Sequence, residues 1–85
     1  MRPRRLLARL ASGHFQNVSF ADARALVEAA GFAILRIEGS HHIFSHPAIP
    51  ELVNLQNVSG EAKPYQLRQF LKLLERYDLR LGDGE

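Results

Sequence analysis

The chain has 85 residues, of which 46% are hydrophobic, and a formal net charge of +2. This length predicts one domain with a modest core, and the absence of cysteine excludes disulfides and thiolate metal sites. No stretch approaches the roughly 18 consecutive apolar residues of a membrane-spanning helix, and the first residues lack the apolar region of a secretory signal. We therefore expect a cytoplasmic protein with no membrane partner.

Positive charge is concentrated near the N-terminus. Of the eleven Lys and Arg residues, four lie within the first ten positions, at Arg2, Arg4, Arg5 and Arg9. The other seven are outnumbered by the nine Asp and Glu residues. Nucleic-acid binding would therefore depend on a local patch together with this N-terminal segment. We divide the chain into a basic extension with a short helix (1–18), a main domain (19–81) and a flexible tail (82–85).

Three helices are predicted. Leucines at helical spacing indicate a short first helix that ends near Gly13. Ser19 can cap a second helix over residues 20–30, which also has apolar residues at helical spacing. Pro64 suits the first turn of the last helix, whose apolar stripe continues to Tyr77.

Three segments have the composition of short strands: residues 32–37, 41–46 and 52–56. We interpret residues 47–50 as a loop, because two prolines cannot both serve a central ladder, and residues 57–63 as a polar loop. Such short connections favour an antiparallel meander. The predicted fold class is α+β, with a three-stranded antiparallel sheet covered on one face by the helices at 20–30 and 64–77, plus the extra N-terminal helix. The other face would remain open, as in many RNA-binding sheets.

A histidine cluster adjoins the turn between the first two predicted strands. The turn and the strand start read Gly39-Ser40-His41-His42, and His46 follows, so three of the four histidines fall within six residues. Histidine is the side chain whose ordinary pKa lets it accept and donate a proton near neutral pH. This cluster therefore predicts acid–base chemistry at one end of the sheet.

Residues 20–79 resemble the HicA family of toxins. The positions that carry the resemblance are Gly31-Phe32, Arg36, Gly39-Ser40-His41-His42-Ile43-Phe44, His46-Pro47, Lys63-Pro64, Leu67-Arg68 and Leu71. The resemblance implies a dsRBD-like α-β-β-β-α fold for residues 19–81, which become the HicA-like domain. It also implies ribosome-independent cleavage of mRNA, inhibition by a HicB-like antitoxin, and catalysis by the histidine directly after glycine-serine, which is His41.

The chemistry fits that residue. Cleaving RNA without a metal requires removing a proton from a 2′-hydroxyl and giving one to the leaving 5′-oxygen, and an imidazole with an ordinary pKa of about 6.5 can do either. We expect His41 to be the general acid/base, with no cofactor. The alternative for His41 is an ordinary polar residue at the start of a strand.

The candidate RNA-binding residues are Gly39, Ser40, His42, Arg36, Phe44, Lys63 and Arg68. Gly39 would let the backbone approach RNA, Ser40 would orient the imidazole or contact a phosphate, and the three cations would steady phosphate charge. Phe44 would stack on a base. One of Ile43 and Phe44 must instead face the helices, and the alternation of residues leaves open which one does.

A metal site is not predicted. His42 and His46 lie four residues apart on a strand, which separates them by about 13 Å at roughly 3.3 Å per residue. A zinc ion needs ligand atoms about 2 Å away, and His41 should point to the opposite face from both. Two other functions stay open at this point, a non-catalytic RNA-binding module on the same fold and an interaction domain whose open sheet binds only protein.

Overall fold

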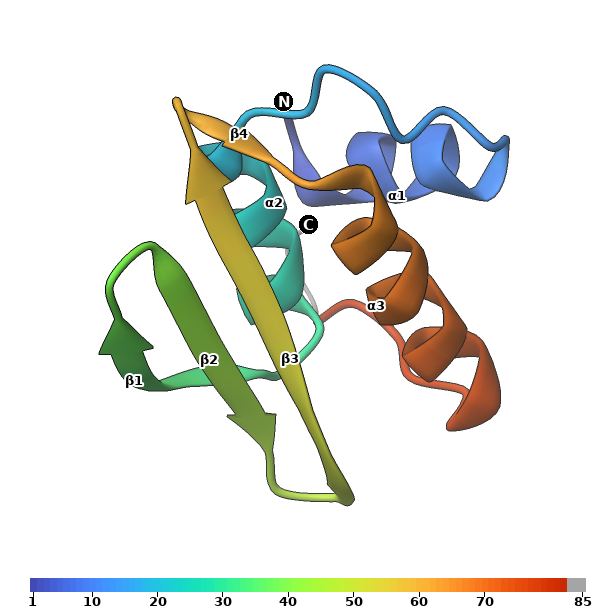
Figure 1. The fold of residues 1–85 in the computed structure, drawn as a ribbon. Helices are drawn as coiled ribbons and strands as arrows, with labels where there is room; N and C mark the ends of the chain where they lie inside the picture. Colours follow the sequence, from blue (N-terminus) through green and yellow to red (C-terminus); the bar gives the residue numbers. More distant parts are fainter. Residues whose placement is uncertain (83–85) are drawn as a thin grey trace.

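A computed structural model describes residues 1–82, and in it three helices lie on one side of a four-stranded antiparallel sheet (Figure 1). The elements are α1 (Pro3–Ala11), α2 (Phe20–Ala29), β1 (Ala33–Glu38), β2 (His41–His46), β3 (Ile49–Val58), β4 (Glu61–Ala62) and α3 (Pro64–Arg76). The strand order is β1-β2-β3-β4. The α+β class and the antiparallel meander are confirmed, and the succession α2, β1, β2, β3, α3 is compatible with a dsRBD-like arrangement.

The sheet extends further than predicted at two places. β3 begins at Ile49 and includes Pro50, where we predicted a loop. β4 pairs only with the last two residues of β3, so no strand lies beside Pro50 on the edge of β3 away from β2. Proline lacks a backbone N–H, but at this open edge its absence removes no hydrogen bond between strands. The predicted polar loop contains β4 itself, which makes a fourth strand too short to show a hydrophobic pattern.

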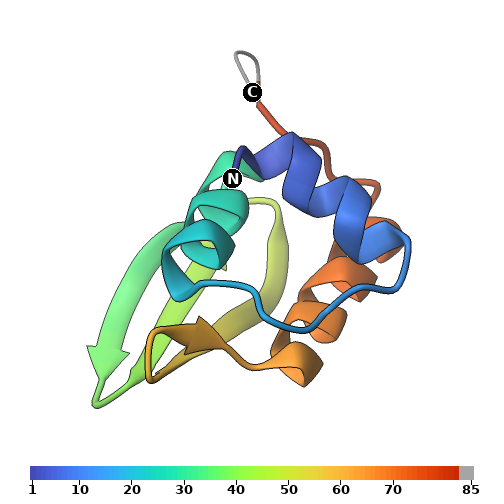
Figure 2. The same ribbon diagram turned by 90° about the horizontal axis from the view of Figure 1, so that it is seen from above.

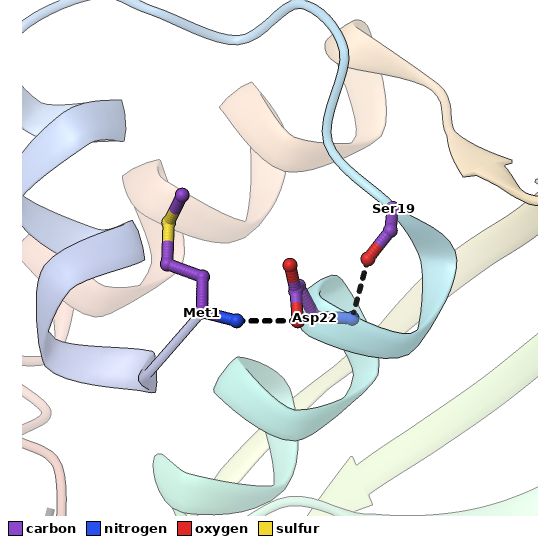
Figure 3. Close-up of polar contacts among 3 residues, drawn as sticks. All are labelled: Met1, Ser19 and Asp22. Carbon is purple, nitrogen blue, oxygen red and sulfur yellow. Dashed lines mark hydrogen bonds and ion pairs between the residues drawn. The ribbon is translucent and has the colours of Figure 1, made fainter.

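α2 begins directly after Ser19, the predicted capping residue, and local polar contacts stabilise this start. The Ser19 hydroxyl accepts a hydrogen bond from the Asp22 N–H at 3.1 Å (Figure 3), which satisfies one of the free donors of the first turn. The Asp22 carboxylate in turn pairs with the terminal ammonium of Met1 at 3.1 Å. This ion pair ties the start of the chain to the start of α2.

The basic extension is an integral part of the core. Leu6 and Leu10 are buried and belong to the same hydrophobic cluster as the residues of α2 and α3. Figure 2 shows α1 lying across α2 and α3 on the side away from the sheet. The helices therefore form two layers, with α2 and α3 against the sheet and α1 as the outer layer.

Of the predicted tail, Gly82 donates a backbone hydrogen bond to the carbonyl of Ala29 at 2.8 Å. The other positions of that tail, 83–85, lie outside the described residues. None of the helices within residues 1–82 combines the length and the apolar character of a membrane span.

We expect Leu10→Ala to destabilise the whole protein rather than only α1. Deleting a fully buried leucine side chain leaves a cavity and costs about 2–5 kcal/mol of unfolding free energy. Urea denaturation followed by circular dichroism measures this change. Arg5→Ala, on the exposed side of the same helix, is the control. Equal and small effects of the two substitutions would show that α1 is dispensable for the fold.

The far end of α3 is fixed to β3 by a polar contact. The Tyr77 hydroxyl donates a hydrogen bond to Glu51 Oε1 at 2.6 Å, and Arg76 donates to Glu51 Oε2 at 2.9 Å. The hydrogen bond from Tyr77 lowers the pKa of the Glu51 carboxyl, with a smaller effect from Arg76. The same bond raises the pKa of the Tyr77 hydroxyl.

Tyr77→Phe should therefore lower stability in a pH-dependent way. Folding lowers the pKa of the Glu51 carboxyl. The ionised carboxylate therefore adds to folding stability above the pKa that Glu51 has in the unfolded chain. This added stability is lost as the pH falls through the pKa that Glu51 has in the folded protein. The difference in urea midpoint between wild type and variant should be clear at about pH 7 and shrink towards about pH 3. Tyr65→Phe, which removes an exposed hydroxyl that contacts Gln66 Nε2 rather than a carboxylate in the first turn of α3, should show no such trend. A Tyr77→Phe effect that is the same at both pH values would contradict the assignment.

Candidate active site on the open sheet face

The turn that precedes His41 has a defined geometry. Gly39 and Ser40 form a two-residue connection between β1 and β2, and Gly39 has a φ of 61°. A positive φ at the first central position only is the pattern of a type II′ turn, whose twist matches that of the flanking strands. The turn places His41 opposite Glu38 on β1, and the pairing of β2 with β3 places His41 opposite Gln56.

His41 lies on the face of the sheet that the helices leave uncovered. Its Nδ1 is 3.2 Å from Asn54 Oδ1. Asn54 lies between Val53 and Leu55, both buried on the helix side, and successive residues of a strand point to opposite faces. Asn54, and the imidazole beside it, therefore point to the open side.

The contact with Asn54 selects one form of the imidazole ring. An amide oxygen can only accept a hydrogen bond, so the His41 Nδ1 must carry the proton in this contact. In the neutral ring, Nε2 then holds the lone pair. The arrangement presents His41 Nε2 as a proton acceptor. Sequence reasoning did not identify Asn54, because nothing in the local pattern shows which residue of β3 lies across from the ring.

The other two histidines of the cluster, His42 and His46, contact aromatic rings and backbone groups near the ends of β2. His42 lies 4.5 Å from the Phe20 ring between ring centroids, and its Nδ1 is 3.2 Å from the Ser40 carbonyl oxygen. His46 packs against Phe32 and accepts a hydrogen bond from the Ala48 N–H at 3.0 Å. Both contact aromatic residues on the helix side, so His41 differs from them in the face it occupies.

Phe44 corrects one predicted role. Its side chain is fully buried, at 0% exposure, in the core beneath α2 and α3. A buried ring cannot stack on a base, so the proposed RNA contact of Phe44 is wrong. The structure also decides between the two neighbours, because Ile43 is half-buried on the face that carries His41.

Charged residues of β1 lie beside His41. Arg36 is opposite Ile43 and Glu38 is opposite His41, so both share the open face. The Arg36 Nε donates to Glu38 Oε2, and both side chains remain more than half exposed. One of the predicted cations, Arg36, is thus within the candidate site, together with an acidic partner.

The two other predicted cations, Lys63 and Arg68, each approach an aromatic ring at or near α3. The Lys63 ammonium lies 5.8 Å from the centre of the Tyr65 ring, just before α3. The Arg68 guanidinium lies 4.9 Å from the centre of the Phe15 ring, between α3 and the segment that precedes α2. The fold therefore does not bring Arg68 together with His41.

A buried glutamine connects α3 to the strand beside His41. Gln66 is 2% exposed, and its Oε1 accepts a hydrogen bond from the Gln56 N–H at 2.7 Å. Its Nε2 is 3.4 Å from the Tyr65 hydroxyl. Because Gln56 is paired with His41, this contact fixes the strand that holds the site. The sequence analysis did not identify Gln66. The feature that could have indicated it is its place as a polar residue next to the apolar stripe of the last helix.

No group of three or more His, Asp or Glu residues in the described part of the chain is arranged to hold a metal ion. The site consists of an imidazole with a defined hydrogen-bond partner, an adjacent ion pair and a glycine turn. This arrangement suits proton transfer at an exposed surface.

A family model described as the HicA toxin of bacterial toxin–antitoxin systems matches residues 20–75. The chain belongs to the HicA toxin family. The match begins at the first residue of α2 and covers the sheet and almost all of α3, so it includes the candidate site and leaves out α1. Neither the curated proteins nor the solved structures gave a match. Family membership makes this HicA protein the toxin of a toxin–antitoxin system, with an antitoxin as partner.

Asn54→Val should change the proton distribution of the His41 ring without unfolding the protein. Valine keeps the strand but removes the acceptor, so Nδ1 loses the contact that holds its proton. Nitrogen chemical shifts of the imidazole in NMR spectra measure the two neutral forms. The shifts of His46, whose partner is the Ala48 N–H, are the internal control. Unchanged His41 shifts in the variant would show that Asn54 does not select the form.

Proposed function

We propose that this HicA toxin is a metal-independent, ribosome-independent endoribonuclease that cleaves mRNA with His41 as general acid/base. The observation that supports this most directly is the His41–Asn54 contact on the open face, which leaves Nε2 as the proton acceptor. The family match supports the assignment to a toxin. The natural compartment for such an activity is the cytoplasm.

In the proposed reaction, His41 Nε2 takes the proton of a ribose 2′-hydroxyl. The resulting oxygen nucleophile forms a bond to the adjacent phosphorus, and the bond from phosphorus to the 5′-oxygen breaks. The products are a 2′,3′-cyclic phosphate and a 5′-hydroxyl, and the proton held by the imidazolium returns to the leaving oxygen. An acid or base positioned in this way contributes about 100- to 10,000-fold in rate.

The turn and β1 supply the RNA contacts of this proposal. A Cβ atom built on Gly39 would meet nothing within 4 Å, so the turn leaves space for a ribose-phosphate backbone to approach. Ser40 is half-buried next to His41 and offers a hydroxyl to a phosphate oxygen. Arg36 offers a guanidinium on the same face, where it would offset the negative charge that develops on the phosphate.

The antitoxin of this proposal is HicB-like and covers the open face. Leu52 is 47% exposed on β3 and shares that face with the half-buried Ile43. Apolar side chains around a polar catalytic group are typical of a surface that a protein partner buries. Occupation of this surface would exclude RNA from His41 and so inhibit the toxin.

His41→Ala should abolish most of the RNA cleavage while leaving the fold intact. We expect a fall of about 100- to 10,000-fold in the rate of mRNA cleavage, because the proton acceptor is lost. The measurement is a gel-based cleavage assay with purified protein, in the presence of a chelator. His14→Ala, an exposed histidine in the segment between α1 and α2, is the matched control and should retain full activity.

Equal cleavage by wild type and His41→Ala would remove His41 from the mechanism. Binding of RNA without cleavage by the wild type would contradict an enzyme and favour the non-catalytic RNA-binding module. Absence of RNA binding at low salt would favour a protein-interaction domain.

A further inference from the structure

β1 is an open edge strand with apolar side chains. It lies at one end of the strand order and packs mainly against β2. All six of its residues are exposed, and three of them are large and apolar: Ile34, Leu35 and Ile37. The opposite edge of the sheet is the two-residue β4. A long exposed edge strand presents free backbone groups to another strand.

The turn geometry shows which backbone groups face outward. In a two-residue hairpin, the residues that flank the turn form a hydrogen-bonded pair, and these are Glu38 and His41. Backbone groups alternate along an antiparallel strand, so the N–H and C=O of Ile37 point away from β2. Ile37 therefore offers one donor and one acceptor to a neighbouring strand.

We infer that β1 pairs antiparallel with β1 of a second copy of this chain, about a two-fold axis at Ile37. Such an interface is isologous, so the surface must be complementary to itself. An axis at Ile37 places Arg36 opposite the partner's Glu38 and Glu38 opposite the partner's Arg36. Ile37 meets the partner's Ile37 in a hydrogen-bonded pair. Because Arg36 and Glu38 flank Ile37 and have opposite charges, a two-fold axis at Ile37 brings each of them opposite its counterion. This self-complementarity argues for a second copy of the chain rather than an unrelated strand.

The charged pairs fall at favourable positions. The pairs on either side of Ile37 are non-hydrogen-bonded pairs, in which side chains of opposite strands approach most closely. Arg36 and Glu38 already form an ion pair within one protomer, and the dimer would bring two such pairs together as a group of four charges of alternating sign on one face. Both His41 rings would lie on this same face, because the axis is perpendicular to the sheet.

The dimer should be weak. The register shift between Ile34 and Arg36 interrupts the regular strand at Leu35, which limits the pairing to the half of β1 nearest the turn. An interface of this length is below the size of stable complexes, so we expect a dissociation constant in the micromolar to millimolar range.

Charge reversal tests the inference. Sedimentation velocity over a concentration series should show a monomer–dimer equilibrium for the wild type. Arg36→Glu opposes two like charges in each of two pairs, and Glu38→Arg does the same, so each should raise the dissociation constant about tenfold or more. The double variant Arg36→Glu/Glu38→Arg should restore the dimer. An equimolar mixture of the two single variants should also associate, since the all-acidic strand of one meets the all-basic strand of the other.

The mixture separates the inference from a local effect, because mixing cannot restore an ion pair within one chain. Arg80→Glu, which breaks an exposed ion pair beyond α3, is the control and should dimerise like the wild type. Ile37→Thr keeps the strand but removes the apolar contact, and should weaken the dimer severalfold. A wild type that stays monomeric at the concentrations used for NMR would overturn the inference, as would single variants that do not associate when mixed. Neither outcome depends on RNA cleavage.

Discussion

The burial of Phe44 is the constraint on which the site depends. Side chains of a strand alternate between faces, so a shift of one residue would move every side chain of β2 to the other side. With Phe44 packed at 0% exposure under the helices, Ile43 and His41 must face away from them. The face on which His41 lies is thus set by Phe44, a core residue three places along the chain. Moving His41 to the other face would require removing the Phe44 ring from the hydrophobic core.

The turn and the neighbouring strands refine that position. Gly39 lets the chain reverse in two residues, which brings His41 directly opposite Glu38, and the pairing of β2 with β3 places it opposite Gln56. Gln66 holds the backbone of Gln56 from the core side, and Asn54 contacts the ring from the open side. The imidazole is therefore oriented by β3, a strand that packs against both α2 and α3.

The two sides of the sheet have different roles. The helix side contains the core. There α1, which contains Arg4, Arg5 and Arg9, adds a second layer over α2 and α3 (Figure 2). The open side combines polar and charged groups with exposed apolar residues such as Leu52. RNA and an antitoxin would compete for this side, whereas the β1 edge lies at its margin. In the functions proposed above, catalysis and inhibition would therefore share the open face, and self-association would use the β1 edge.

Local chemistry in the sequence was sufficient to predict much of this protein. Ser19 and Pro64 mark helix starts because capping and a fixed φ act within a few residues. The glycine-serine-histidine turn marks the site and the family for a similar reason, since turn geometry and imidazole chemistry are properties of adjacent residues. Residues that act across the fold were decided only by the tertiary structure. Whether Phe44 or Ile43 faces inward depends on where the helices pack, and β4 exists only because β3 offers it an edge. Asn54 reaches His41 from thirteen residues away in the chain, through a register that no local pattern contains.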